Sequence, residues 1–272
     1  MSSVPRARGR DSCGWRKVFA VFGPSTNTVV EPEFAAMRPA GVTNQYRDIY
    51  IENAQALSDA AFLAGIELIQ GAVDAAMRSA LSCEPDYLVM GVSAVSFMGG
   101  AEACRRQVAH LRELTGKEIS VGPVSCVEAM KAYGGIRRIA VLSPYFPVAN
   151  EHVKRFFSDY GIETVRDLPL RCKSWTDISR VNETQLAQAL KQLDGDDIDA
   201  IVQVGTNLSM ARLAPYAEAF LDKPVIAINT ATYWHALRTN AILDGVDGFG
   251  PLLAHLDLRR DQPVDPTASH QR

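Results

Sequence analysis

Several features are scarce in this chain, and each scarcity argues against a class of protein. The formal net charge is −3 over 272 residues, with 28 Lys and Arg against 31 Asp and Glu, so no basic excess favours nucleic acid or an anionic membrane surface. The five cysteines are scattered, without a C-x-x-C pair or a neighbouring histidine cluster, which argues against a disulfide framework or a structural zinc site. We therefore expect a cytoplasmic protein without a metal, nucleic-acid or membrane partner.

The two ends of the chain are typical of loose tails. Residues 1–16 are basic and lack the apolar core of a secretory signal, and residues 257–272 are polar and contain two prolines. The chain as a whole is 47% apolar, and its length suits one large domain or two lobes.

Between these tails, apolar runs typical of buried parallel strands alternate with helical segments. Because strands separated by helices of this size indicate parallel βαβ units, we predict an α/β fold. Strands are expected at residues 17–23, 87–92, 119–124, 136–142, 162–167, 198–204 and 224–228, and helices at residues 54–81, 101–114, 126–133, 147–160, 183–193, 212–221 and 230–239.

The pattern occurs twice. The strand and proline-containing loop AVFGPSTN at residues 20–27 corresponds to AVLSPYFP at residues 140–147, and each round continues to a second strand, ending at Ser93 or at Gly205. We predict two similar Rossmann-like lobes whose parallel sheets are related by a pseudo-twofold axis. Because ligands of such sheets bind beyond the carboxyl ends of strands, the site is expected in the cleft between the lobes. The predicted boundaries are residues 17–134 plus about 230–256 for the first lobe and 135–229 for the second.

The loops at these four strand ends have no Lys, Arg, His or carboxylate at their centres. They offer neutral donors beside backbone amides at helix starts, an arrangement that suits a small carboxylate. It does not suit a metal, and Gly23-Pro24-Ser25 lacks the glycines of a dinucleotide fingerprint, so neither a metal nor a bound dinucleotide is expected. The donors are Ser25, Thr26, Asn27, Ser93, Ser96, Ser143, Tyr145, Thr206, Asn207 and Ser209.

Individual residues also have plainer interpretations. Ser25 and Asn207 could cap helices, Ser93 could be the small residue that a turn needs, and Tyr145 could be an ordinary half-buried ring. Cys126 opens a helix after a strand, where a thiol can have a lowered pKa, so it is a candidate proton donor; a small buried apolar residue is the alternative.

The sequence resembles two groups of the aspartate/glutamate racemase superfamily, the maleate cis–trans isomerases and the arylmalonate decarboxylases. The similarity extends over about residues 17–240. GPSTNTVVEPE at residues 23–33 is similar to the opening motif of the isomerases, and Ser143-Pro-Tyr145 to their second-lobe tyrosine loop. SAVSFM at residues 93–98 and Gly205-Thr-Asn-Leu fall where cysteine loops are expected, whereas SFMGGAEAC at residues 96–104 and the spacing from Arg137-Arg138 to Tyr145 resemble the decarboxylases.

The resemblance implies one active site between the lobes, no cofactor, and a homo-oligomer, a dimer or larger. Family members use one or two cysteines there to transfer protons or to attack a double bond. Asparagine, tyrosine and hydroxyl-bearing loops hold the substrate carboxylates and an enediolate intermediate. Carried over by motif, catalytic or binding roles fall on Asn27, Tyr145, Thr206 and Asn207, with Ser25, Ala94 and Gly205 as further binding positions.

Both cysteine positions are changed here, to Ser93 and Gly205. A serine hydroxyl without an activating base is too weakly acidic to replace a thiol near pH 7. Anion-binding donors need no cysteine. We therefore predict a cofactor-independent, decarboxylase-like enzyme that converts a small mono- or dicarboxylic acid through an enediolate or enolate. Asn27, Ser93, Tyr145 and the backbone amides of residues 205–207 would hold the developing charge, and Tyr145, Cys126 or water would supply the proton.

Three alternatives stay open at this stage. The first is a maleate isomerase-like enzyme with another nucleophile, and the second is a hydrolase or hydratase that uses Ser93 or a positioned water. The third is a carboxylate-binding paralogue without activity. The sequence does not name the substrate beyond a small carboxylate.

Overall fold

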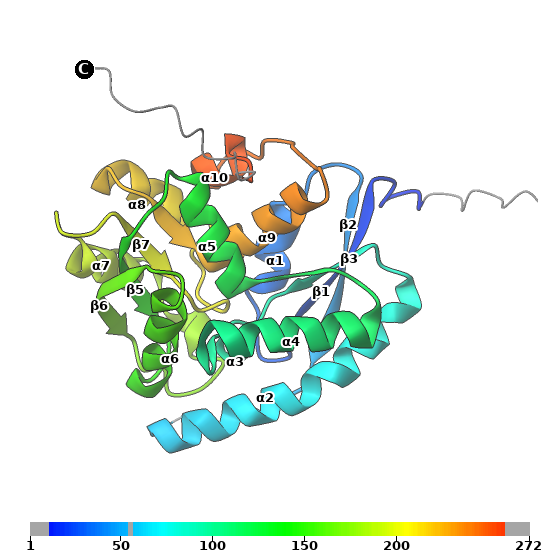
Figure 1. Cartoon of the computed structure of the whole chain (residues 1–272), viewed down its shortest axis with the longest axis horizontal. Coiled ribbons are helices and arrows are strands. Elements are labelled where there is room, and N and C mark those ends of the chain that lie inside the picture. The colour runs from blue at the N-terminus through cyan, green and yellow to red at the C-terminus, as the bar shows by residue number, and fades with distance from the viewer. Residues whose placement is uncertain (1–10, 54–56, 259–272) are drawn as a thin grey trace, which may run out of the picture.

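Two four-stranded parallel sheets with the same strand order form the framework of the molecule (Figure 1). The structure is a computed structural model, and it describes residues 11–53 and 57–258. The strands are β1 (Lys17–Pro24), β2 (Val42–Ile49), β3 (Tyr87–Met90), β4 (Ile119–Val121), β5 (Arg138–Ser143), β6 (Glu163–Pro169), β7 (Ala200–Gln203) and β8 (Val225–Ala227). The order is β2-β1-β3-β4 in the first sheet and β6-β5-β7-β8 in the second. This repetition confirms the predicted α/β fold of two similar lobes.

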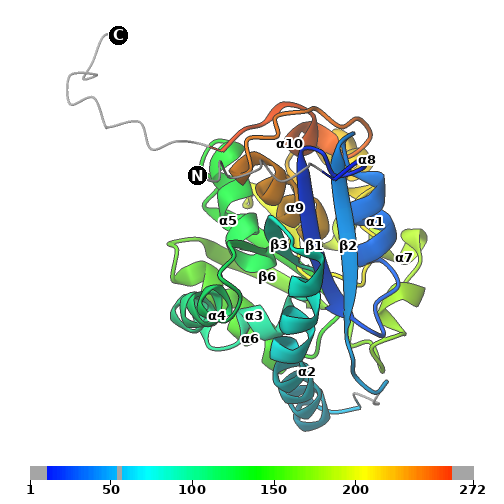
Figure 2. The ribbon, with the colours of Figure 1, turned by 90° about the vertical axis from the view of Figure 1, so that its right-hand side faces the viewer.

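Helices connect the strands and cover the sheets. In the first lobe, α2 (Asp59–Ala80) and α4 (Gly100–Thr115) contact each other and the sheet, and α1 (Val30–Ala36) and α9 (Ile228–Thr239) do the same. Figure 2 looks onto β3, β1 and β2, which lie side by side in that order. The remaining helical elements are α3 (Ala94–Phe97), α5 (Gly122–Ala132), α6 (Pro147–Ser158), α7 (Glu183–Leu193), α8 (Leu213–Leu221), α10 (Gly250–His255), η1 (Leu81–Cys83) and η2 (Ile178–Arg180).

Local sequence signals explain where several helices begin and end. Asn182 caps α7 and forms a capping box with Gln185. Proline, whose missing N–H costs nothing in a first turn, occurs at the start of α5 and α6. Gly116 adopts a left-handed conformation (φ 66°) and ends α4. Most predicted helices and the strands of the pocket appear close to their expected bounds. However, α2 begins at Asp59 instead of residue 54, and α5 begins at Gly122, so residues 122–124 are helical and Cys126 does not open the helix. β2 and the short α1, α3 and α10 were not predicted.

The last part of the described chain contacts elements of both sheets. α9 follows β8 directly and contacts β3, β4, α5 and α1, so it lies at the junction of the two sheets. The division into lobes near residues 134 and 230 stays a prediction. Most of both predicted tails, residues 1–10 and 259–272, lies outside the described residues. Within the described part, Arg16 forms a bidentate pair with Asp244, with N–O distances of 2.8 and 2.7 Å.

Helix α2 has an apolar inner face. Phe62, Ile66 and Ile69 are each 2% exposed and pack into the core. Of the described residues, only the segment Asp59–Cys83 is long and apolar enough to cross a membrane by length and composition, with a mean hydropathy of 1.4. A helix of a protein core passes the same test, and the contacts of α2 with β1 and β2 account for its inner face.

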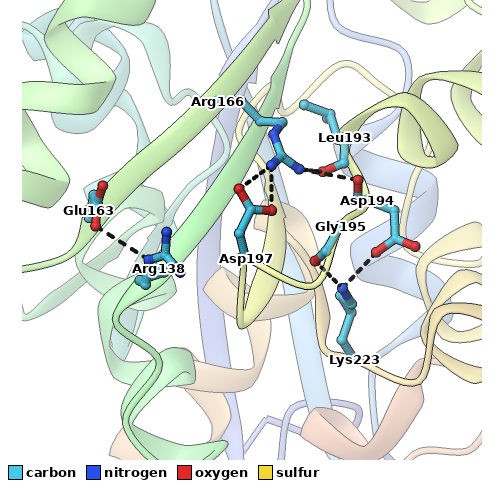
Figure 3. A network of polar contacts seen from close by, with 8 residues as sticks. All are labelled: Arg138, Glu163, Arg166, Leu193, Asp194, Gly195, Asp197 and Lys223. Carbon is cyan, nitrogen blue, oxygen red and sulfur yellow. Dashed lines mark hydrogen bonds and ion pairs between the residues drawn. The ribbon is translucent and has the colours of Figure 1, made fainter.

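An ionic network ties the second sheet together at the amino ends of its strands (Figure 3). Arg166 on β6 pairs with Asp197 and donates to the carbonyl of Leu193, and Lys223 pairs with Asp194 at 2.7 Å. These contacts hold the loop that precedes β7. The opposite, carboxyl ends of the same strands carry the neutral loops that the sequence analysis selected.

Candidate active site

A pocket lies where β1, β3, β5 and β7 end, with about 380 Å³ of open space that is partly accessible to solvent. The pocket is lined by Pro24, Thr26, Asn27, Ile51, Ile69, Val92, Ser93, Ala94, Pro144, Tyr145, Trp175, Ile178, Gly205, Thr206 and Asn207. Seven of the nine predicted site residues, together with Thr26, therefore line one pocket: Asn27, Ser93, Ala94, Tyr145, Gly205, Thr206 and Asn207.

Ser93 and Tyr145 bring one hydroxyl group from each lobe into contact. Ser93 Oγ lies 2.6 Å from Tyr145 OH, and the two oxygens lie 2.7 and 2.9 Å from the carbonyl oxygen of Val204. The two hydroxyl groups have only two protons for these three oxygen–oxygen contacts. One hydroxyl therefore donates to the other, which donates to the carbonyl of Val204. A ligand oxygen that accepts from either hydroxyl would replace one of these bonds.

Neither hydroxyl is set up to shuttle protons near neutral pH. Burial raises the pKa of the Tyr145 phenol well above its usual range, and the hydrogen bond with Ser93 lowers it only in part. Tyr145 therefore stays protonated and acts as a hydrogen-bond donor. Ser93 has no His, Lys or carboxylate beside it among the residues that line the pocket. A nucleophilic serine needs such a base.

Asn27 and Thr206 join the ends of β1 and β7. Asn27 Oδ1 accepts from the backbone N–H groups of Val29 and Val30, and this fixes the orientation of the amide. Its Nδ2 donates to Thr206 Oγ1 at 3.3 Å. The hydroxyl proton of Thr206 and the second Nδ2 proton of Asn27 have no acceptor among the described residues. Both groups line the pocket and can donate to a bound oxygen.

The backbone of the loop after β7 adds further donors. In the described part of the chain, the N–H groups of Gly205, Thr206 and Asn207 have no acceptor, whereas the N–H of Leu208 already donates to Gly205. Consecutive free amides beside side-chain donors favour a negatively charged ligand.

Asn207 and Ser25 make structural hydrogen bonds. Asn207 Nδ2 donates to the carbonyl of Trp175 at 3.0 Å and its Oδ1 accepts from the N–H of Thr28 at 3.1 Å, so this side chain ties three segments together. Ser25 Oγ donates to the carbonyl of Ile51 and accepts from its N–H, each at 3.1 Å. Ser25 is not among the residues that line the pocket.

Gly205, after β7, is adjacent to the ring of Pro144, which follows the neighbouring strand β5. A Cβ atom at position 205 would lie 2.3 Å from Cδ of Pro144, which is far inside van der Waals contact. Pro144 therefore occupies the space that any side chain at this position would need. Both residues line the pocket, and together they close this part of its wall without a reactive group.

Cys126 does not line the pocket. Its side chain is fully buried in α5, and burial raises the pKa of its thiol far above the ordinary value, opposite to the lowering considered for a helix start. Burial also raises the pKa of the Cys104 thiol to about 12 and that of the half-buried Cys172 to about 11. None of the cysteines lines the pocket. The expectation that Cys126 could supply a proton therefore has no support from its position.

An apolar group of side chains completes the pocket, and the sequence analysis did not identify it. It consists of Ile69 from α2, Ile51 from the loop after β2, Val92 after β3, and Trp175 and Ile178 from the loop after β6. Phe62 supports it from behind, with ring centroids 5.1 Å from Trp175 and 5.6 Å from Tyr145. The sequence signal for these residues is weak, because an apolar side chain that lines a pocket resembles one in the core.

The pocket contains no charged side chain. Within residues 11–53 and 57–258, no group of three or more His, Cys, Asp or Glu side chains is placed to hold a metal ion. The arrangement can therefore bind an anion through neutral donors and enclose an apolar substituent beside it.

A family model for arylmalonate decarboxylase matches residues 33–253. The chain belongs to this family. The match covers most of the described fold and includes every pocket residue after the opening loop. The family model and the relatives described below are decarboxylases and isomerases of the superfamily that the sequence resembles. The predicted resemblance is therefore confirmed at the level of the superfamily.

Maleate isomerases are also similar to this chain. A maleate isomerase of Geobacillus stearothermophilus is 24% identical over 154 residues, 54% of this chain and 60% of the relative, so the match spans about three fifths of that protein's length. A cysteine-to-serine mutant of maleate cis–trans isomerase from Nocardia farcinica, solved with a covalently bound succinylcysteine intermediate, has a TM-score of 0.79 at 19% identity, covering 87% of this chain and 98% of that one.

Two further solved structures have the same fold. Maleate isomerase from Pseudomonas putida S16, solved with maleate, has a TM-score of 0.77 at 21% identity, covering 88% of this chain and 97% of that one. A double mutant of arylmalonate decarboxylase in its liganded form has a TM-score of 0.74 at 19% identity, covering 87% and 97%. At these identities, the structural matches establish the fold only.

Proposed function

We propose that this protein is a cofactor-independent decarboxylase of a small malonate-type acid that carries an apolar substituent. The observation that supports this proposal most directly is the composition of the pocket: neutral donors from Asn27, Ser93, Tyr145 and Thr206 lie beside an apolar group that includes Ile69 and Trp175. The family model for arylmalonate decarboxylase agrees with it.

In the proposed reaction, the bond between the substituted carbon and one carboxylate breaks. Carbon dioxide leaves, and the bonding electron pair moves into the remaining carboxylate to form an enediolate. The donors of Thr206, Tyr145 and the loop amides would stabilise the charge on its two oxygens, and such preorganised donors are among the largest contributions to catalysis. The apolar side chains would favour loss of the charged carboxylate as neutral carbon dioxide.

The last step adds a proton to the carbon of the enediolate. No thiol lines the pocket, and the pKa of Tyr145 is raised, so water is the proton donor that fits best. The product would then carry one solvent-derived hydrogen at this carbon, which mass spectrometry after reaction in deuterated water would detect.

Thiol-dependent maleate isomerisation is the second candidate, because the curated relative is a maleate isomerase. The Nocardia enzyme was solved with a succinylcysteine intermediate, and a mechanism through such an adduct needs a cysteine at the substrate. This pocket is lined by none. Incubation with maleate and detection of fumarate tests this candidate.

A substrate panel tests the main proposal. Malonate, methylmalonate and phenylmalonate are incubated with the wild-type protein, and carbon dioxide release and the monocarboxylate product are measured. We expect turnover to rise with the apolar substituent, and Trp175→Ala to reduce this preference. Absence of carbon dioxide from all three acids would refute the proposal; binding without turnover would instead identify a carboxylate-binding paralogue.

A further inference from the structure

Glu33 is a buried carboxyl group that connects the first lobe to the loop after β7. It lies on α1 and is 8% exposed. Its Oε2 accepts from Asn229 Nδ2 at 2.7 Å, and its Oε1 accepts from the Ala211 N–H at 3.0 Å and from the Ser209 hydroxyl at 3.5 Å. Donors from α9 and from the loop after β7 therefore converge on one side chain of α1.

Asn229 extends this connection to the pocket. Its Nδ2 also donates to the carbonyl oxygen of Thr206 at 2.9 Å, so both amide protons are used. The Thr206 hydroxyl in turn accepts from Asn27. Glu33 itself does not line the pocket, but Asn229 connects it to Thr206, which does.

We propose that Glu33, in its carboxylate form, is a positioning residue that acts through Asn229 to hold Thr206 and the neighbouring loop amides in their anion-binding arrangement. This inference rests on the proposed role of that loop in binding a substrate carboxylate. The Glu33 carboxylate lies outside the pocket and would control how tightly the substrate carboxylate is bound inside it.

Protonation of Glu33 on Oε2 would weaken the hydrogen bond that this oxygen accepts from Asn229. A protonated Oε2 would face the Nδ2 donor of Asn229 across 2.7 Å. The buried Oδ1 of Asn229 has no hydrogen-bond partner and could accept this proton, but only if the amide turned over. Thr206 would then lose its donor. Burial raises the pKa of Glu33 to about 7, against the lowering effect of its donors, so both forms occur near neutral pH.

The groups that contact this carboxyl are all neutral, and the ionisable groups on the neighbouring elements are engaged elsewhere. On α9, the Tyr233 hydroxyl donates to Asn44, and Arg238 donates to backbone carbonyls after this helix. Arg38, just after α1, donates to the carbonyl of Val42. His235 on α9 has its Nδ1 2.8 Å from Ser120 Oγ, and burial lowers its pKa to about 4. Arg212 in the loop after β7 donates to Gly248 and lies over the Phe249 ring. The pKa of Tyr46 on β2 is raised by burial and by the charges of Asp48 and Glu31.

The first test needs no substrate. Backbone and side-chain amide signals of Thr206 and Asn229 are followed by NMR in the ligand-free wild-type protein from about pH 6 to about pH 8. We expect both signals to shift with one midpoint near pH 7, and the midpoint to disappear in Glu33→Gln. Ser209→Ala removes one donor from an exposed position and should move the midpoint upward. Signals that do not titrate, or a midpoint that survives in Glu33→Gln, would overturn the inference.

The second test measures binding of phenylmalonate by calorimetry over the same pH range. Loss of one charge-assisted hydrogen bond corresponds to about tenfold weaker binding, which we expect for Glu33→Gln, together with loss of the pH dependence seen in the wild type. Glu31→Gln, an exposed position on the same helix, is the matched control and should bind like the wild type. Equal affinities of the two variants would refute the positioning role. If the wild type binds no phenylmalonate, the proposed function fails, while the NMR midpoint still tests the contact.

Discussion

Ser93 Oγ and Tyr145 OH, which come from different lobes, lie 2.6 Å apart and share the carbonyl oxygen of Val204 as acceptor. The position where the resemblance places a catalytic cysteine is thus occupied by a hydroxyl that is hydrogen-bonded to a second hydroxyl. Such a pair can donate a hydrogen bond to a negatively charged oxygen. It is poorly suited to transfer the proton itself, because the pKa of Tyr145 is raised and no base that lines the pocket activates Ser93.

Replacement of Tyr145 by phenylalanine should reduce turnover while leaving the fold intact. The ring packs against Phe62 and stays in place, but one donor to the enediolate is lost. Removal of one such donor typically lowers kcat by about 100-fold or more. Steady-state kinetics with phenylmalonate measures the effect, and a thermal melt shows that the fold is retained. Unchanged kcat would rule out a role of Tyr145 in charge stabilisation.

A side chain at position 205 should destabilise the protein. In Gly205→Ala the new Cβ would overlap the Pro144 ring, and overpacking of this kind typically costs about 1–3 kcal/mol. Gly71→Ala is the matched control, because Gly71 lies in α2 with no atom near its Cβ position, and alanine should stabilise the helix by about 0.5–1 kcal/mol. Chemical denaturation measures both. The reasoning fails if the two variants change stability in the same direction.

The same overlap with Pro144 should destabilise any variant that places a cysteine at position 205. Gly205→Cys alone should fold poorly, whereas Gly205→Cys combined with Pro144→Ala removes the obstructing ring and should recover much of the stability. A double-mutant cycle measures this coupling between adjacent residues. Additive effects of the two substitutions would show that Pro144 is not the obstacle.

Cys126→Ala should leave catalysis almost unchanged. The thiol is fully buried outside the pocket, and burial raises its pKa, so it has neither access nor acidity for proton transfer. The loss of a buried sulfur should cost about 1 kcal/mol of stability. Steady-state kinetics of the wild type and of Cys126→Ala, each before and after treatment with a thiol reagent, provide the readout. A large fall in kcat at unchanged stability would restore Cys126 as a proton donor.

The sequence predicts the polar part of the site well and the apolar part poorly, for physical reasons. Strand ends of a parallel sheet meet at one edge, so Asn27, Ser93, Tyr145 and Thr206 could be brought together from the strand pattern alone. Ile69 and Trp175 lie on a helix and an irregular loop, and nothing in their residue types separates a pocket wall from a core.

Two other omissions have different causes. β2 is an edge strand, paired only with β1, and half-buried polar residues between Val42 and Ile49 mask its period. Its counterpart β6 was predicted, so the duplication itself was the missed signal. Glu33 looked like an acidic residue in the first turn of a helix, where exposed carboxylates are common. Its burial results from contacts with residues far along the chain.

Two buried groups, Glu33 and His235, should contribute opposite slopes to the pH dependence of stability between pH 4.5 and 6.5. Burial raises the pKa of Glu33 from 4.5 to about 7, so its contribution to stability is fully present below pH 4.5 and is lost as pH rises through 7. Burial lowers the pKa of His235 from 6.5 to about 4, so its contribution is present above pH 6.5 and is lost as pH falls through 4.

Single substitutions should reveal each slope. Glu33→Gln lacks the Glu33 contribution, so relative to the wild type this variant should lose stability as pH falls from 7, by up to about 3 kcal/mol. His235→Gln can keep a hydrogen bond to Ser120, which lies 2.8 Å from Nδ1, and should instead gain stability as pH falls from 7. Urea denaturation at fixed pH values measures both curves. Parallel curves for the two variants would show that neither Glu33 nor His235 controls the pH response, because their predicted slopes relative to the wild type have opposite signs.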